Sequence, residues 1–196
     1  MPEVLKLLKE YNATATFMVV GSFAATHEKE LVQVLKEGHE LGNHGWLDKA
    51  YEMSSDEAFA ADVDACSNVV KRAQRDAGLK EEVRWFRAPH GRYTTTMHDV
   101  LKQKHLQNVM CDTYASCPVV QDGAFIGEFM STHAEPGSIL LIHMPEVAVR
   151  RWCLDGVRIL LEGLHRRNLK AVSVSELRAL AAGGRQFSDV GSALPH

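Results

Sequence analysis

The chain has 196 residues, of which 45% are hydrophobic, 24% charged and 7% aromatic, a profile typical of one globular domain. Lysine and arginine number 22 and aspartate and glutamate 25, so the formal net charge is −3, which argues against a nucleic-acid binder that neutralises phosphates. No apolar run approaches the roughly 18–20 residues of a membrane helix; residues 139–142, one of the longest, have the length of a strand. An enzyme or a binding domain remains.

Helix-like and strand-like segments alternate along the chain. The segment 2–11 is amphipathic with Pro2 in its first turn, which predicts a helix, and the Thr-, Val- and Phe-rich segment 13–20 predicts a strand. A serine-rich capping signal opens a helix that Gly78 ends. We expect helices at 2–11, 24–37, 54–77, 94–103, 123–134, 151–166 and 175–182, and strands at 13–20, 39–44, 84–87, 107–112, 138–143 and 170–174.

Six apolar strands separated by helices predict an α/β fold with a parallel sheet covered by helices. The pattern allows an open doubly wound sheet or a barrel, and both gather functional side chains at the carboxyl ends of the strands. His44, Arg87, Asp112 and His143 each end a predicted strand. No glycine-rich phosphate loop follows the first strand, so these side chains are candidates for metal binding and proton transfer.

The cysteines give little direction. Four are present, at positions 66, 111, 117 and 153, and no two have the C-x-x-C spacing of a zinc knuckle or redox site. We expect reduced, partly buried thiols that fill apolar space.

The first candidate for chemistry is the pair His44 and Asp48, four residues apart just beyond a strand. A loop or helical turn would bring both side chains to one side, and an imidazole nitrogen with a carboxylate oxygen suits zinc or a similar divalent ion. A surface pair without a metal is the alternative.

Two further motifs follow. Arg87 is followed by Pro89 and Gly91, a rigid turn that would fix the guanidinium and expose backbone N–H groups; the alternative is a loop arginine packed on Trp85. His143 ends the most apolar strand, where an imidazole is suited to proton transfer; the alternative is a buried structural histidine.

Together these motifs resemble the polysaccharide deacetylases, the NodB-homology domain of carbohydrate esterase family 4. The resemblance covers roughly residues 1–180 and rests on A-T-A-T-F-M-V-V-G at 13–21, H-E-L-G-N-H at 39–44, Arg87-x-Pro-x-Gly and Leu141-x-His143. It implies a distorted (β/α) barrel at 1–182 that lacks its first strand, followed by a flexible tail at 183–196. It also implies a hydrolase that removes acetyl groups from N-acetylated polysaccharides such as chitin or peptidoglycan, or from xylan, with a divalent metal, usually zinc.

The resemblance implies a role for each matching residue. His44 matches the first metal-binding histidine, and Asp48 stands where a second histidine is usual and is itself a competent ligand. Arg87 matches the arginine that holds the catalytic base, and His143 matches the general acid. His90 takes a position usually filled by tyrosine, whose backbone N–H stabilises the oxyanion.

Other positions match the substrate pocket and the fourth motif. Leu141 matches the apolar wall of the acetyl pocket. Asp112 and Tyr114 lie in the fourth motif, but Ser116 and Cys117 occupy the stretch where an acid that tunes the histidine is expected.

One departure from the family pattern bears on activity. The family's first motif, T-F-D-D-G or similar, supplies the catalytic base and a metal-binding aspartate, and no aspartate precedes Asp48 here. We therefore expect either an amino-truncated deacetylase or an inactive remnant that binds carbohydrate through Trp46, Trp85 and Tyr114. An α/β-hydrolase is excluded because the chain has no G-x-S-x-G elbow. Family members are secreted or attached to the cell wall, whereas no signal peptide is recognised in this chain.

Overall fold

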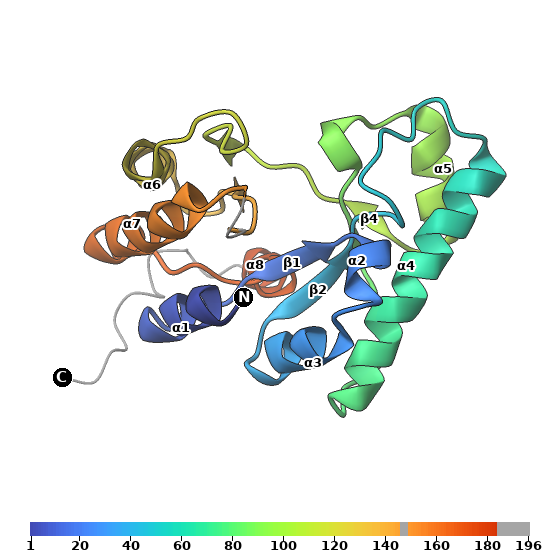
Figure 1. Ribbon diagram of the computed structural model, residues 1–196, viewed down its shortest axis with the longest axis horizontal. Helices are drawn as coiled ribbons and strands as arrows, with labels where there is room; N and C mark the ends of the chain where they lie inside the picture. The colour runs from blue at the N-terminus through green and yellow to red at the C-terminus, as the bar shows by residue number, and fades with distance from the viewer. Residues whose placement is uncertain (146–148, 184–196) are drawn as a thin grey trace. The chain divides into compact units, whose positions relative to one another are not determined.

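The computed structural model describes residues 1–145 and 149–183 (Figure 1). The helices are α1 (Pro2–Glu10), α2 (Gly21–Ala24), α3 (Glu28–Lys36), α4 (Asp56–Asp76), the 3₁₀ turn η1 (Pro89–Gly91), α5 (Thr95–Gln103), α6 (Gly123–His133), α7 (Trp152–Arg166) and α8 (Val174–Ala182). The strands are β1 (Thr16–Val19), β2 (Glu40–Asn43), β3 (Trp85–Phe86), β4 (Gln107–Asn108), β5 (Thr113–Tyr114) and β6 (Leu140–Leu141). The chain forms two compact units: Thr16–Met110, here the sheet unit, and Met1–Ala15 with the chain from Cys111 onward, here the terminal unit.

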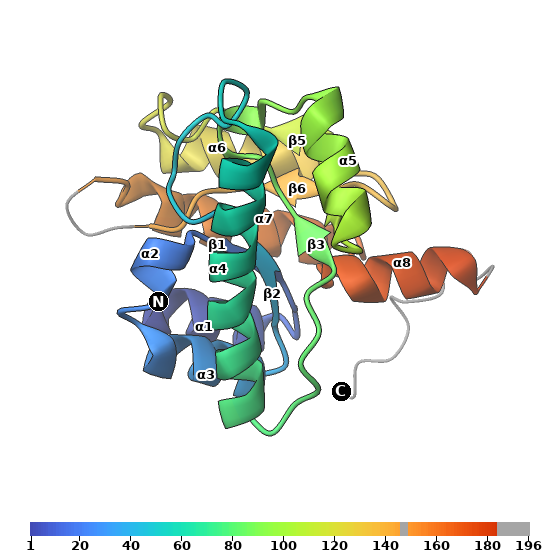
Figure 2. The same ribbon diagram turned by 90° about the vertical axis from the view of Figure 1, so that its right-hand side faces the viewer.

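The sheet unit is built on one parallel sheet with the strand order β1-β2-β3-β4. Thr16 lies opposite Glu40 and Val19 opposite Asn43, so β1 and β2 pair over their full length. Helices connect each strand to the next, and α4, with 21 residues the longest, is seen along its length in Figure 2. This parallel α/β arrangement confirms the predicted fold class.

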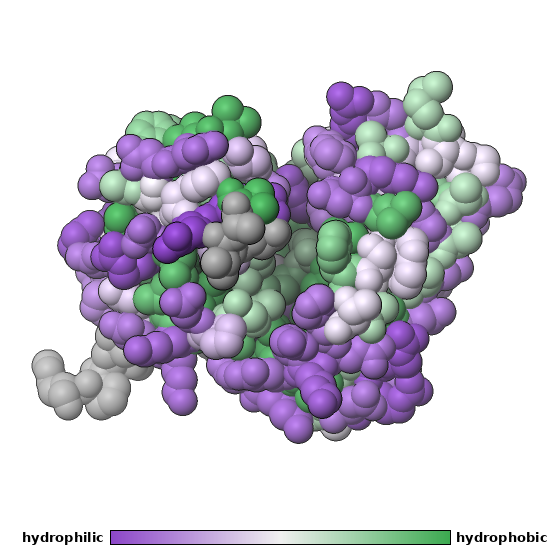
Figure 3. All heavy atoms as spheres, in the orientation of Figure 1, coloured by the Kyte–Doolittle hydropathy of each residue, from purple (hydrophilic) through white to green (hydrophobic). Residues whose placement is uncertain are grey.

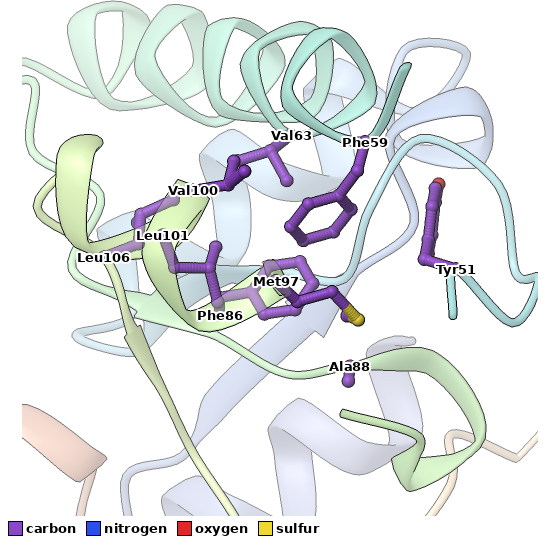
Figure 4. Packing of buried hydrophobic residues seen from close by; sticks show 9 residues of the cluster. All are labelled: Tyr51, Phe59, Val63, Phe86, Ala88, Met97, Val100, Leu101 and Leu106. Atoms are coloured by element: carbon purple, nitrogen blue, oxygen red, sulfur yellow. The ribbon is translucent and has the colours of Figure 1, made fainter. Parts of the chain in front are cut away.

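The core of the sheet unit fixes the position of β3. Phe86 is fully buried and its ring lies edge-on to that of Phe59 on α4, with 5.6 Å between centroids (Figure 4). Tyr51 stacks obliquely on Phe59 at 5.3 Å. The cluster comprises Tyr51, Phe59, Val63, Phe86, Ala88, Met97, Val100, Leu101 and Leu106. Burial of this apolar surface holds Phe86 in place, and with it the residue that follows, Arg87.

The terminal unit contains a second parallel pair, β5 and β6 (Figure 2). In this pair Thr113 lies opposite Leu140. Its main helices, α6 and α7, lie side by side (Figure 1). Their contact is close because small residues face each other: a Cβ added at Gly127 would lie 2.8 Å from the carbonyl oxygen of Gly156. Cys117, Ile126, Met130 and Cys153 are buried in the core of this unit.

Three predicted elements were wrong, each for a local physical reason. The helix expected at 24–37 is broken, because the Thr26 hydroxyl donates to the carbonyl oxygen of Phe23 and ends α2. The strand expected at 107–112 covers only β4, because the chain passes there from one unit to the other. Residues 170–173 form no strand: Ser173 instead caps α8 by accepting a hydrogen bond from the Glu176 N–H.

The surface agrees with the balanced composition. On the face drawn in Figure 3, hydrophilic side chains predominate and apolar ones occupy smaller areas. Within residues 1–145 and 149–183, no helix is long and apolar enough to cross a membrane. The tail expected at 183–196 lies outside the described residues except for Gly183, and the expectations of one domain at 1–182 and of a missing first strand stay predictions.

The α6–α7 contact generates a stability prediction. In an ordinary helix, Gly→Ala stabilises by about 0.5–1 kcal/mol, but at Gly127 the added methyl would also meet Cβ of Ile159 at 2.6 Å. We expect Gly127→Ala to lower the free energy of unfolding by about 1–3 kcal/mol, the usual cost of overpacking. Urea denaturation measures this, with the exposed Glu128→Ala on the same helix as control. A Gly127→Ala protein more stable than wild type would contradict the close packing.

Candidate functional site

The sheet unit places its candidate residues at the carboxyl ends of β2 and β3. Asn43 ends β2 and is fully buried: its Nδ2 donates to the carbonyl oxygen of Val63 and to Oγ of Ser67, at 2.8 and 2.9 Å. Its Oδ1 accepts from the Gly45 N–H at 2.7 Å, and Gly45 has a φ of +78° that favours glycine. The Asn43 side chain therefore ties the turn that carries His44 to α4 and also holds the residue on the other side of His44.

A side-chain hydrogen bond fixes the His44 ring. Its Nδ1 lies 2.7 Å from the carbonyl oxygen of Arg87. A carbonyl can only accept, so Nδ1 carries a proton in this contact. Burial lowers the pKa of His44, an effect that outweighs the hydrogen bond to Arg87 and the charge of Asp48. In its favoured neutral form, the ring therefore presents the Nε2 lone pair, the arrangement in which histidine binds metals.

Asp48 lies near the same ring but is solvated. Its side chain is 57% exposed, and its Oδ1 lies 3.8 Å from Nε2 of His90. Its charge also acts on His44. His90 sits in η1 with a φ of 57°, and its ring is half exposed. The two residues predicted to bind metal are thus in one electrostatic neighbourhood, with His90 as an additional basic side chain.

These residues fit a divalent ion in part. The Nε2 atom of His44 and the carboxylate of Asp48 are donors that zinc accepts. Across the described ranges, however, no group of three or more His, Cys, Asp or Glu side chains is arranged to hold a metal ion. The sheet unit thus supplies two suitable donors where catalytic zinc sites use three.

Arg87 and Trp85 have defined partners in the sheet unit. The Arg87 N–H donates to the carbonyl oxygen of Asn43 at 3.0 Å, and its Nη1 donates to that of Val109 at 3.2 Å. Trp85 is only 5% exposed, and its Nε1 donates to Glu40 at 3.0 Å. Trp85 is therefore a core residue, and its burial leaves little ring surface for the predicted stacking on a sugar.

The terminal unit holds the remaining predicted residues. His143 follows β6; its Nδ1 lies 3.1 Å from Sγ of Cys117, and its backbone N–H donates to the same sulfur at 3.2 Å. The Tyr114 ring lies 6.0 Å from that of His143, centroid to centroid. Leu141 pairs with Tyr114 in the β5–β6 ladder. His143, Leu141 and Tyr114 are thus neighbours in the terminal unit.

Asp112 has a structural role that the catalytic prediction does not account for. Its Oδ2 accepts from the Ile139 N–H at 2.9 Å and its Oδ1 from the Thr113 hydroxyl at 2.8 Å. The carboxylate thereby joins the starts of β5 and β6. A hydrogen-bond partner that the structure shows for the His143 ring is Cys117, a contact that sequence reasoning missed; its signal was the position of Cys117 in the fourth motif.

Comparison with known proteins gives the family. The family model "Polysaccharide deacetylase" matches residues 1–109. The peptidoglycan-N-acetylglucosamine deacetylase of Bacillus cereus is 28% identical over 181 residues, covering 90% of this chain and 80% of that protein. The chitooligosaccharide deacetylase of Azorhizobium caulinodans is 28% identical over 162 residues, covering 80% of this chain and 74% of that one.

Solved structures show the fold. The peptidoglycan deacetylase PdaC of Bacillus subtilis has a TM-score of 0.81 at 22% identity, covering 93% of this chain and 84% of its own. An acetyl xylan esterase of family 4 from Clostridium thermocellum, solved with a cobalt ion, has a TM-score of 0.79 at 23% identity, covering 95% and 86%. A CE4 family pseudoenzyme of Bacillus anthracis also has a TM-score of 0.79, at 18% identity, covering 90% and 59%.

The strand-end residues, the parallel α/β fold and the match over more than half of the chain agree with one another. This chain belongs to the polysaccharide deacetylase family, the NodB-type carbohydrate esterases of family 4.

Proposed function

We propose that this protein removes acetyl groups from N-acetylated polysaccharides such as chitin or peptidoglycan, using a divalent metal, most simply zinc. The observation that carries the proposal is the 2.7 Å contact between His44 Nδ1 and the Arg87 carbonyl oxygen, because it directs the lone pair of Nε2 outward as a ligand. The names of the Bacillus and Azorhizobium relatives, which act on peptidoglycan and on chitooligosaccharides, support this substrate class.

His44 and Asp48 would hold the ion. When bound, a divalent ion supplies Lewis-acid polarisation of a carbonyl oxygen. The cobalt ion in the Clostridium esterase structure shows that this fold accommodates such an ion in a relative.

The chain's own residues supply the remaining chemistry in this proposal. A water molecule adds to the acetyl carbonyl carbon, and His143, as imidazolium, protonates the amide nitrogen as its bond to that carbon breaks, so that acetate and the sugar amine are released. The backbone N–H of His90 donates to the developing oxyanion. Leu141 forms the apolar wall for the acetyl methyl. Arg87 orients the catalytic base, a role for which we assign no residue of the described ranges.

A second function, carbohydrate binding without turnover, is favoured by one specific observation. Within the described residues, no group of three or more His, Cys, Asp or Glu side chains is arranged to hold a metal ion, and one similar structure is a pseudoenzyme. In this case Trp46 and Tyr114, both half-buried, are the stacking surfaces for sugar rings. Trp85 is too deeply buried to stack on a sugar ring.

Zinc binding tests the first proposed function independently of any measurement of activity. We expect the protein to bind zinc and His44→Ala to weaken that binding by at least about tenfold, because even the loss of groups that only orient ligands costs 10–100-fold. The matched control is His27→Ala, since His27 Nδ1 also contacts a carbonyl oxygen, that of Phe23, at 2.9 Å. Isothermal titration calorimetry measures both. Equal zinc affinity in wild type and His44→Ala would refute the assigned ligand.

Acetate release separates the two functions. With zinc and N-acetylglucosamine oligomers, we expect acetate release that a chelator abolishes and that His143→Ala lowers by about 10²–10⁴-fold, the usual contribution of a general acid. His133→Ala is the control, because His133 lies in the same unit with its Nδ1 2.8 Å from the Phe129 carbonyl oxygen. Oligomer binding without acetate release would favour the second function, and release that survives both chelation and His143→Ala would contradict the mechanism.

A further inference from the structure

A buried thiol pair contacts the His143 ring in the terminal unit. Cys117 and Cys153 are both fully buried, and their side chains are hydrogen-bonded to each other. The sulfur of Cys117 lies 3.1 Å from Nδ1 of His143 and also accepts the His143 backbone N–H at 3.2 Å. Cys117 therefore contacts the ring and the main chain of the same histidine.

The Cys117 backbone is held as firmly as its thiol. Its carbonyl oxygen accepts from Nε1 of Trp152 at 2.8 Å, at the start of α7. Trp152 directly precedes Cys153, so α7 anchors both cysteines. Hydrogen bonds to both its sulfur and its backbone thus hold Cys117 beside His143.

The protonation of the thiols decides the direction of the hydrogen bonds. Burial raises the pKa of Cys117, and it raises that of Cys153 to about 12, so both thiols keep their protons near neutral pH. Cys153 can then donate to the Cys117 sulfur, and the Cys117 S–H can donate to Nδ1 of His143, which in that case accepts with its lone pair. In this arrangement the neutral His143 ring carries its proton on Nε2.

A redox or metal role for the pair is disfavoured. Buried, protonated thiols are poor nucleophiles and react slowly with oxidants. In the part of the chain that the structure describes, no His, Cys, Asp and Glu group suited to a metal includes these residues. What the geometry offers is a hydrogen-bonded support for an imidazole.

We propose that Cys117 is the positioning residue of His143, its buried thiol fixing the orientation and the Nε2–H tautomer of the ring. The inference rests on the proposed role of His143 as the general acid. A neutral S–H donor favours the uncharged imidazole, whereas a carboxylate in its place would favour the imidazolium. In the imidazolium form, which the proposed general acid requires, Nδ1–H donates to the Cys117 sulfur instead, so the same contact orients the ring in both protonation states.

Other ionisable groups lie beside His143 and Cys117 or act on them through their charge. Tyr114 of β5 packs beside the His143 ring, Cys153 reaches it through Cys117, and the charge of Arg150 acts on both thiols. None of these is altered in the variants below, so a change in His143 reports on position 117.

The test is ¹⁵N NMR of the imidazoles in the full chain, with the His143 signals assigned from a His143→Gln sample. In wild type we expect His143 to be the Nε2–H tautomer near pH 7. Cys117→Ser, which keeps a hydroxyl donor, should retain that tautomer, whereas Cys117→Ala should give a mixture of tautomers. Cys117→Asp should raise the pKa of His143 by about 1–3 units, as a neighbouring opposite charge does.

Cys66→Ala is the matched control, because Cys66 is an equally buried cysteine whose thiol donates to the Val19 carbonyl oxygen. It should leave the His143 tautomer and titration unchanged. If Cys117→Asp does not fold, the difference in the His143 tautomer between Cys117→Ser and Cys117→Ala tests the inference. A folded Cys117→Ala protein with the wild-type tautomer and titration of His143 would overturn the inference.

The pH dependence of acetate release is the second readout. In the pH–rate profile, the limb assigned to His143 should move to higher pH in Cys117→Asp, by the same amount as the pKa that NMR gives for His143. Absence of acetate release from every variant, with the NMR changes present, would refute the proposed function and leave the positioning role of Cys117 supported. Wild-type NMR behaviour in the Cys117 variants would refute the positioning role whatever the activity.

Discussion

The candidate site depends on one hydrogen bond, between His44 Nδ1 and the Arg87 carbonyl oxygen. The β2–β3 ladder contains a single register pair, Asn43 with Phe86. One residue further on, the Arg87 N–H donates to the Asn43 carbonyl oxygen, and the His44 imidazole donates to the carbonyl oxygen of Arg87. The imidazole thus extends the pairing of two short strands, and the same contact selects which nitrogen faces outward.

Hydrophobic burial holds this contact in place. Phe86 is packed between α4 and α5, and Asn43 is bonded to α4 through Val63 and Ser67. Without the fixed ends of β2 and β3, a donor and an acceptor from residues 43 positions apart would have to find each other against the full cost of chain entropy. The burial of apolar side chains therefore offsets the entropic cost of ordering the ends of β2 and β3, and the polar groups determine the geometry of the contact between His44 and Arg87.

Sequence reasoning predicted what depends on local pattern. The alternation of helices and strands and the position of His44 directly after a strand both follow from periodicity and motif order. The broken helix at 24–37 could not be predicted because it depends on a threonine side chain that competes for a carbonyl group. The strand expected at 107–112 is short because the chain passes there from the sheet unit to the terminal unit, and the position of that passage depends on tertiary packing.

The site was predicted less completely than the fold. Trp85 is a core residue and Asp112 a strand clamp because of partners distant in sequence, Glu40 and Ile139. The contact of Cys117 with His143 spans 26 residues and joins residue types with no motif of their own. Long-range side-chain pairs of this kind become visible only once the strands are placed.

The two histidines have different hydrogen-bond partners at Nδ1: a carbonyl oxygen for His44 and a thiol for His143. The central claim is that the carbonyl contact fixes His44 as a neutral Nδ1–H ring with an outward Nε2 lone pair. The imidazole ¹⁵N shifts of His44 in the metal-free protein near pH 7 test this most directly. We predict the Nδ1–H tautomer, with Nε2 at the shift of an unprotonated nitrogen; a His44 ring protonated at Nε2 would contradict the account.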